Sequence, residues 1–203
     1  MDKSTYILRQ SLGWLGAALP FMCLIFGALG MYNEPTWFHT MSQTFYTPAI
    51  TPFVGVLWAV GIFLIAYGAA NLYDYWGDRV VNIASGIFAI GVAVFPCQTA
   101  LFTHVGMFML PVGTSAILHY ISAGGLFIML AINILWLFRK GKSEVHNRIY
   151  LICGLGIVFG FLLIGATVLF GLWGFLGWIA EAIMLLCFSF AWLVKGKAFK
   201  LIS

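Results

Sequence analysis

The chain has 203 residues, of which 63% are apolar and 8% charged, and its mean hydropathy is +1.02. About a quarter of the residues in soluble domains carry charge, so this composition excludes an ordinary soluble globular protein. The net charge of +4 comes from ten Lys and Arg residues that flank apolar segments and form no basic patch with interleaved aromatics. We therefore expect no nucleic-acid partner.

The apolar residues form six runs that are each long enough to cross a hydrocarbon layer about 30 Å thick. Backbone amides in lipid must be paired within their own segment, so each run is predicted to be a helix. The predicted fold class is all-α, with residues 1–203 forming a single transmembrane domain that is a six-transmembrane-helix bundle. The expected helices cover about residues 11–31, 52–73, 80–101, 117–138, 149–170 and 176–194.

The first expected helix follows two basic residues, Lys3 and Arg9. Its apolar run is too long for the h-region of a signal peptide, so we interpret it as a membrane span. With six spans, all ten Lys and Arg fall on one side of the membrane and none on the other. Because basic loops stay in the cytoplasm, both termini are predicted to be cytoplasmic.

The connections on the opposite, outer side hold several candidate functional residues. The segment after the first helix contains Glu34 and His39, and the connection after the third contains Cys97 and His104. The four cysteines of the chain form no CxxC pair, and we interpret them as small packing residues.

The fourth expected helix carries His119 two or three residues from its outer end. Ser122 follows at i+3 and shares the face of His119, and Tyr120 adjoins it. The sixth expected helix carries Glu181, which is the one acidic residue deep within a predicted span. His119 and Glu181 should therefore lie at similar depth below the outer surface.

Polar side chains inside apolar helices cost free energy unless they are paired, bound or hydrated. We therefore predict an outer-facing polar pocket between the third, fourth and sixth helices that binds a lipid or small amphiphile. Its expected ligand-binding residues are His119, Glu181, His104, Ser122 and Tyr120. The expected partners are membrane lipids; a homo-oligomer or a second membrane protein stays open.

Two other interpretations of the same residues stay open. His104, His119 and Glu181 have the side chains of a zinc site, which would make the protein an intramembrane hydrolase that acts on lipid. Glu34, His39 and Cys97 are further donors on that side, but a short-spaced signature such as HExxH is absent, so we expect no cofactor. Alternatively, His119 and Glu181 pair directly and only tie two helices together in a non-catalytic assembly subunit.

A resemblance to known proteins extends from about Met41 to Lys197. It is carried by FYTP (Phe45–Pro48), DRVVNIASGIFAIGVAVFP (Asp78–Pro96), LHYISA (Leu118–Ala123) and the EAIMLLCFSFAWLVKG tail that starts at Glu181. These segments resemble bacterial six-helix membrane proteins of the broad Frag1/DRAM-like type. The resemblance implies a six-helix fold in a bacterial inner membrane and, because relatives of this type include lipid-handling proteins, favours a lipid ligand.

Overall fold

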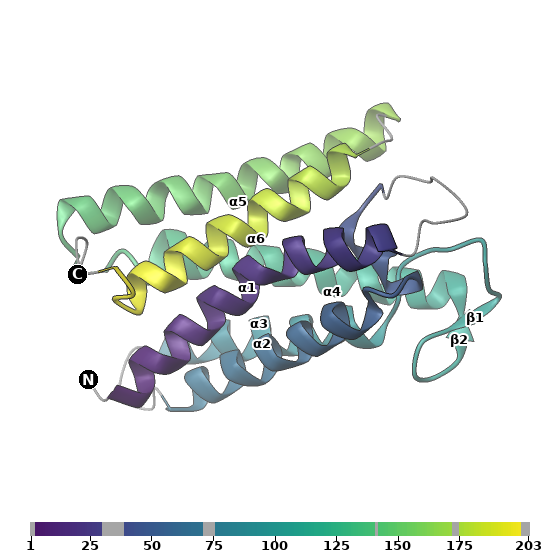
Figure 1. The fold of residues 1–203 in the computed structure, drawn as a ribbon. Coiled ribbons are helices and arrows are strands. Elements are labelled where there is room, and N and C mark those ends of the chain that lie inside the picture. Colours follow the sequence, from purple (N-terminus) through teal and green to yellow (C-terminus); the bar gives the residue numbers. More distant parts are fainter. Residues whose placement is uncertain (1–2, 30–38, 71–75, 141, 172–174, 200–203) are drawn as a thin grey trace.

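The computed structural model describes residues 3–29, 39–70, 76–140, 142–171 and 175–199 (Figure 1). Within these ranges, six helices are long and apolar enough to cross a membrane. They are α1 (Lys3–Leu29), α2 (Ile50–Ala70), α3 (Trp76–Val94), α4 (Val112–Ile132), α5 (Glu144–Phe170) and α6 (Leu176–Lys195). The predicted fold class is confirmed: the chain is an all-α bundle and a multi-pass membrane protein.

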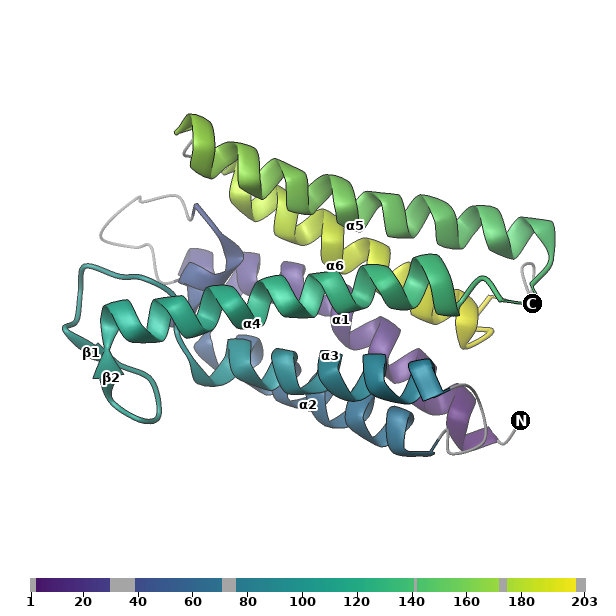
Figure 2. The same ribbon diagram turned by 180° about the vertical axis from the view of Figure 1, so that it is seen from behind.

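Short elements complete the described chain. They are the 3-10 helix η1 (Met41–Tyr46), the π-helical turn η2 (Asn133–Leu137) that continues α4, and the antiparallel strands β1 (His104–Val105) and β2 (Leu110–Pro111). The strands form a hairpin at the end of the bundle opposite the two termini (Figures 1 and 2).

Two predicted boundaries next to the candidate site are wrong, the end of α3 and the start of α4. α3 ends at Val94 and not near residue 101, because Pro96 has no N–H and disfavours helical backbone at the residue before it. α4 starts at Val112, one turn before the predicted start, directly after Pro111. The connection between them is therefore longer than expected and includes Cys97 and the hairpin.

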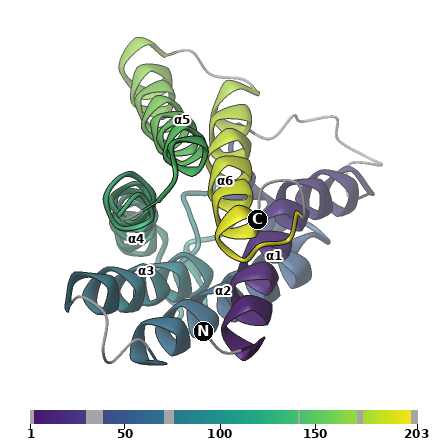
Figure 3. The same cartoon turned by 90° about the vertical axis from the view of Figure 1, so that its left-hand side faces the viewer.

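The six helices form a ring in chain order. Each helix packs against the next one, and α6 returns to pack against α1, as the end-on view in Figure 3 shows. The α2–α3 interface is the most extensive of the six, and the interface of α5 with α4, apart from the η2 turn, is the sparsest. Since α5 is also the helix with the smallest buried share, the ring has one open seam, between α4 and α5.

Glycines bring α2 and α3 into close contact. A Cβ atom on Gly86 would overlap the carbonyl oxygen of Gly61, and one on Gly68 would lie 3.0 Å from the carbonyl oxygen of Arg79. Small residues at such positions allow helix backbones to approach where lipid leaves no hydrophobic driving force for association.

The end of the bundle that holds both termini is tied together by a buried arginine. Arg9 on α1 donates from Nη2 to the Tyr67 hydroxyl on α2 (2.7 Å) and from Nη1 to the carbonyl oxygen of Lys195 at the end of α6 (3.3 Å). The second bond satisfies a carbonyl that has no partner within its own helix, at the negative end of the helix dipole. One side chain thus joins three helices.

A buried asparagine pair joins α3 to the end of α4. Asn133 donates from Nδ2 to Oδ1 of Asn82 (2.7 Å), and Asn82 donates from Nδ2 to the carbonyl oxygen of Asp78 (2.7 Å). Asn133 also opens η2, where Phe138 N–H donates to its carbonyl oxygen (2.9 Å). A π-helical turn at this point rotates the residues that follow it relative to the rest of α4.

Candidate functional site

A cavity of about 600 Å³ lies at the end of the bundle opposite the termini. Its walls come from α4, α5 and α6, together with the segment that leads into η1 and the segment that follows α3. The lining residues are His39, Thr40, Ser42, Gln43, Cys97, Gln98, His119, Tyr120, Ala123, Gly124, Phe127, Phe161, Ile164, Thr167, Val168, Gly177 and Glu181. This volume is within the range of small-molecule sites.

The segment after α3 is fixed by side chains from other elements. Three consecutive backbone carbonyls lie beyond the helix, where no later turn supplies N–H donors. Each carbonyl accepts a hydrogen bond from a side chain. His119 Nδ1 donates to Phe95 O (2.7 Å), Ser115 Oγ to Pro96 O (2.9 Å) and Tyr46 Oη to Cys97 O (2.6 Å). The site thus has one rigid wall although that wall is not helical.

His119 has a structural role and also lines the cavity. Its side chain is 2% exposed, and its ring lies edge-on to Tyr120 with 5.8 Å between ring centroids. A carbonyl oxygen can only accept, so the bond to Phe95 assigns the proton to Nδ1. In this tautomer the neutral ring keeps Nε2 as an acceptor.

Glu181 holds the start of η1 against α6. Its carboxylate accepts from the Met41 N–H and from Oγ of Ser42, the latter at 3.4 Å. One turn earlier, Gly177 permits close approach, since a Cβ there would overlap the carbonyl oxygen of His39. Ionised carboxylates accept several hydrogen bonds, so Glu181 keeps acceptor capacity toward the cavity that it lines.

The structure brings together some of the predicted site residues but not all. His119, Tyr120 and Glu181 line one cavity. Within the described chain, His119 and Glu181 share no hydrogen bond, because each bonds to a backbone group of a different segment. The direct pair that would tie α4 to α6 is therefore not formed.

Two predicted site residues lie elsewhere. Ser122 is turned toward α3, where a Cβ on Gly91 would overlap its hydroxyl oxygen. A separation of three residues leaves about 60° between two side chains on a helix, which is enough to move Ser122 out of the cavity wall. His104 lies exposed on the hairpin, with Nδ1 3.3 Å from Oγ1 of Thr103.

The alternative metal site of His104, His119 and Glu181 is not assembled. Across the described ranges, no three His, Cys, Asp or Glu side chains form a group that could hold a metal ion. Cys97 lines the cavity, but burial raises the pKa of its thiol to about 12, with nearby Glu181 acting in the same direction, so it stays protonated at neutral pH. Glu34 lies outside the described residues.

One wall of the cavity differs from the prediction. The pocket was predicted between the third, fourth and sixth helices, but α5 lines it and α3 does not. The available signal was Thr167, the last polar residue of the fifth apolar run, which donates to the carbonyl oxygen of Ile164 (2.7 Å) and lines the cavity. The amides of Gln43 and Gln98 were also missed, because residues in connections have no helical periodicity to mark them.

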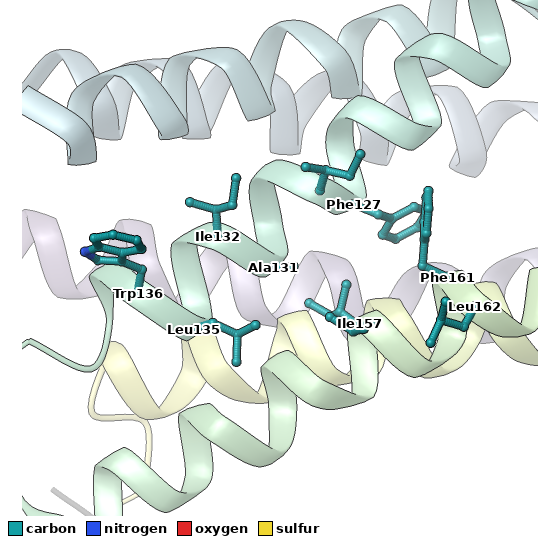
Figure 4. A pocket seen from close by; sticks show the side chains of 10 residues that line it. Phe127, Ala131, Ile132, Leu135, Trp136, Ile157, Phe161 and Leu162 are labelled. Carbon is teal, nitrogen blue, oxygen red and sulfur yellow. The ribbon is translucent and has the colours of Figure 1, made fainter.

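An apolar groove of about 430 Å³ follows the α4–α5 seam (Figure 4). On both helices its lining residues follow one another at alternating intervals of one and three, which places them on one face. They are Phe127, Ile128, Ala131, Ile132, Leu135, Trp136, Ile157, Val158, Phe161 and Leu162. Phe127 and Phe161 line both the groove and the polar cavity, so the two spaces adjoin at this pair of rings.

Comparisons of the chain with protein-family models, with curated proteins and with solved structures find no match. The Frag1/DRAM-like resemblance therefore stays a prediction, and the function is argued from the cavity and the groove.

Proposed function

We propose that this membrane protein binds a lipid or other small amphiphile in the cavity between α4, α5 and α6. One observation carries the proposal: a cavity whose apolar walls carry several polar side chains adjoins an apolar groove between two membrane helices. Polar groups within a membrane span are costly unless bound or hydrated, and pockets that combine apolar walls with a few polar groups are typical ligand sites.

The division of the site matches the two parts of an amphiphile. The cavity supplies hydrogen-bonding groups from His119, Glu181 and Thr167. The groove supplies only hydrocarbon and aromatic surface, apart from the indole N–H of Trp136. A polar head in the first and a hydrocarbon chain in the second would each meet a surface of matching polarity.

Two glycines that have open space provide a matched test. A Cβ on Gly124 of α4, which lines the cavity, or on Gly165 of α5, which does not, meets no atom within 4 Å. Gly124→Leu should extend into the cavity and lower the amount of co-purified amphiphile at least tenfold, as measured by native mass spectrometry. Gly165→Leu should leave it unchanged. Equal retention in the two variants would reject the cavity as the binding site.

The orientation in the membrane is part of the proposal. Every Lys and Arg of the described chain lies at the end of the bundle that holds the termini, and basic ends face the cytoplasm. We infer cytoplasmic termini and an outward-facing cavity, in the inner membrane of a bacterium. Single cysteines at Lys142 should react with an impermeant maleimide only from the cytoplasmic side, and cysteines at Gln43 only from the outside. Reaction of both from one side would contradict this orientation.

A zinc measurement separates binding from hydrolysis. We expect purified protein to contain well under one equivalent of zinc, because the described donors do not converge. Stoichiometric zinc that is lost in both His119→Ala and His104→Ala would instead favour the hydrolase.

A further inference from the structure

We propose that the ligand is a single-chain amphiphile whose head donates hydrogen bonds and carries no negative charge, a hydroxyl or amine head, with its chain in the α4–α5 groove. This inference rests on the proposed function and adds the chemical class of the ligand. It follows from the charge of the cavity, the lone pairs within it and the length of the adjoining groove.

Positive charge is absent from the whole outward half of the protein. No Lys or Arg occurs in residues 10–78, 80–138 or 149–194, which include every cavity-lining residue and every outward connection. Phosphate and carboxylate heads are normally recognised by Arg or Lys. An anionic head in this cavity would lie near the Glu181 carboxylate in a poorly hydrated space without a compensating cation, which is strongly unfavourable.

Three polar groups of the cavity are acceptors, beside the Gln43 and Gln98 amides and the Tyr120 hydroxyl, which can both donate and accept. The Glu181 oxygens accept from Met41 and Ser42 and retain further lone pairs. The Thr167 hydroxyl donates its hydrogen to the carbonyl oxygen of Ile164, so toward the cavity it can only accept a hydrogen bond. The Nε2 atom of neutral His119 is likewise an acceptor, because Nδ1 carries the proton. A head with O–H or N–H groups complements this set.

The dimensions favour one long chain. The groove follows α4 from Phe127 to Trp136, about 14 Å at about 1.5 Å per residue. From His119 in the cavity to Trp136, the combined path along α4 is about 26 Å, close to the thickness of the hydrocarbon layer of about 30 Å. The groove is a single seam between two helices, and Figure 4 shows its side chains arranged along that one line.

The test compares three probes with the same acyl chain: a monoacylglycerol, a long-chain primary amine and a lysophosphatidylglycerol. Native mass spectrometry of the full chain in detergent should show at least tenfold more bound monoacylglycerol or amine than lysophosphatidylglycerol. Glu181→Gln separates the two favoured heads, since it should weaken the amine more than the monoacylglycerol. Equal or tighter binding of lysophosphatidylglycerol would overturn the assignment of the head.

Groove variants test the position of the chain. Val158→Trp narrows the groove, and Leu162→Trp, at a side chain that is 66% exposed, does so with little risk to folding. Both should reduce binding of the preferred probe about tenfold, while Ile152→Trp, also on α5 but outside the groove and 69% exposed, should not. Unchanged binding in the folded groove variants would overturn the assignment of the chain.

The outcomes distinguish this inference from the proposed function. Lysophosphatidylglycerol that binds tightly and is lost in Gly124→Leu would leave the cavity as the site and reject only the class of head. If Gly124→Leu changes the binding of none of the three probes, both the cavity as the binding site and the assigned class of head are rejected.

Discussion

The α2–α3 and α4–α5 interfaces both contain glycines, yet they are packed in opposite ways. At α2–α3, Gly61 and Gly86 face each other so closely that a Cβ on either would overlap the other helix. At α4–α5, a Cβ on Gly124 would meet no atom within 4 Å, and the two helices border a groove. Gly61 and Gly86 therefore bring two helices together at the first interface, whereas Gly124 leaves room at the second.

This difference indicates which side of the ring is structural. Close backbone approach at α2–α3, the Arg9 contacts between α1, α2 and the C-terminal end of α6, and the asparagine pair between α3 and η2 hold that side of the ring together. The α4–α5 seam has the sparsest packing of the ring, and the space beside it is lined by polar groups at one end. A ligand site is expected where side chains leave volume that the fold does not need.

The largest difference in stability should appear when glycine is replaced by leucine at each of the two interfaces. Gly86→Leu forces a side chain into the backbone of α2, and overpacking of this severity should lower the free energy of unfolding by about 3 kcal/mol. Gly124→Leu should change it by less than about 1 kcal/mol, since the new side chain enters open space and glycine is itself a poor helix former. Unfolding by denaturing detergent measures the change in both variants. Equal losses of stability would contradict the proposed difference between the two interfaces.

Arg9→Met tests the structural side at the end of the bundle that holds the termini. The change removes donors to the Tyr67 hydroxyl and the Lys195 carbonyl, so we expect a loss of about 1–3 kcal/mol in the free energy of unfolding. Arg148→Met is the control, because its i,i+4 pair with Glu144 is exposed and should contribute no more than about 0.5 kcal/mol. If Arg9→Met lowers the free energy of unfolding by less than Arg148→Met does, the buried Arg9 contacts do not hold the helices together.

A smaller effect is expected at the asparagine pair between α3 and η2. Asn133→Leu leaves the Oδ1 atom of Asn82 without its donor, and hydrogen bonds between membrane helices contribute about 0.6 kcal/mol on average. The double variant Asn82→Leu with Asn133→Leu should recover part of that loss, because neither polar group then remains unpaired. Additive losses in thermal unfolding would indicate that the two residues act independently.

Much of the fold could be predicted from the sequence because lipid requires each span to satisfy its own backbone. The apolar runs therefore located all six helices, and polar side chains within them pointed to His119 and Glu181. The hydrogen-bond partners of these two residues could not be predicted. Phe95 O is available to His119 because α3 ends before Pro96, and the Met41 N–H is available to Glu181 because its segment folds back onto α6. Similarly, the sequence does not give the rotation of α4 about its own axis. Without that rotation, helical periodicity cannot predict that Ser122 faces α3 while Tyr120 faces the cavity.

Photocrosslinking from two neighbouring phenylalanines on α5 tests the ligand site most directly. Phe161 lines both the cavity and the groove, whereas Phe159 is 58% exposed and lines neither. A photoreactive phenylalanine analogue at Phe161 should capture one discrete amphiphile, and the same analogue at Phe159 should capture a mixture that reflects the bulk membrane. The same lipid mixture at both positions would show that the seam is ordinary lipid-facing surface and would contradict a binding site there.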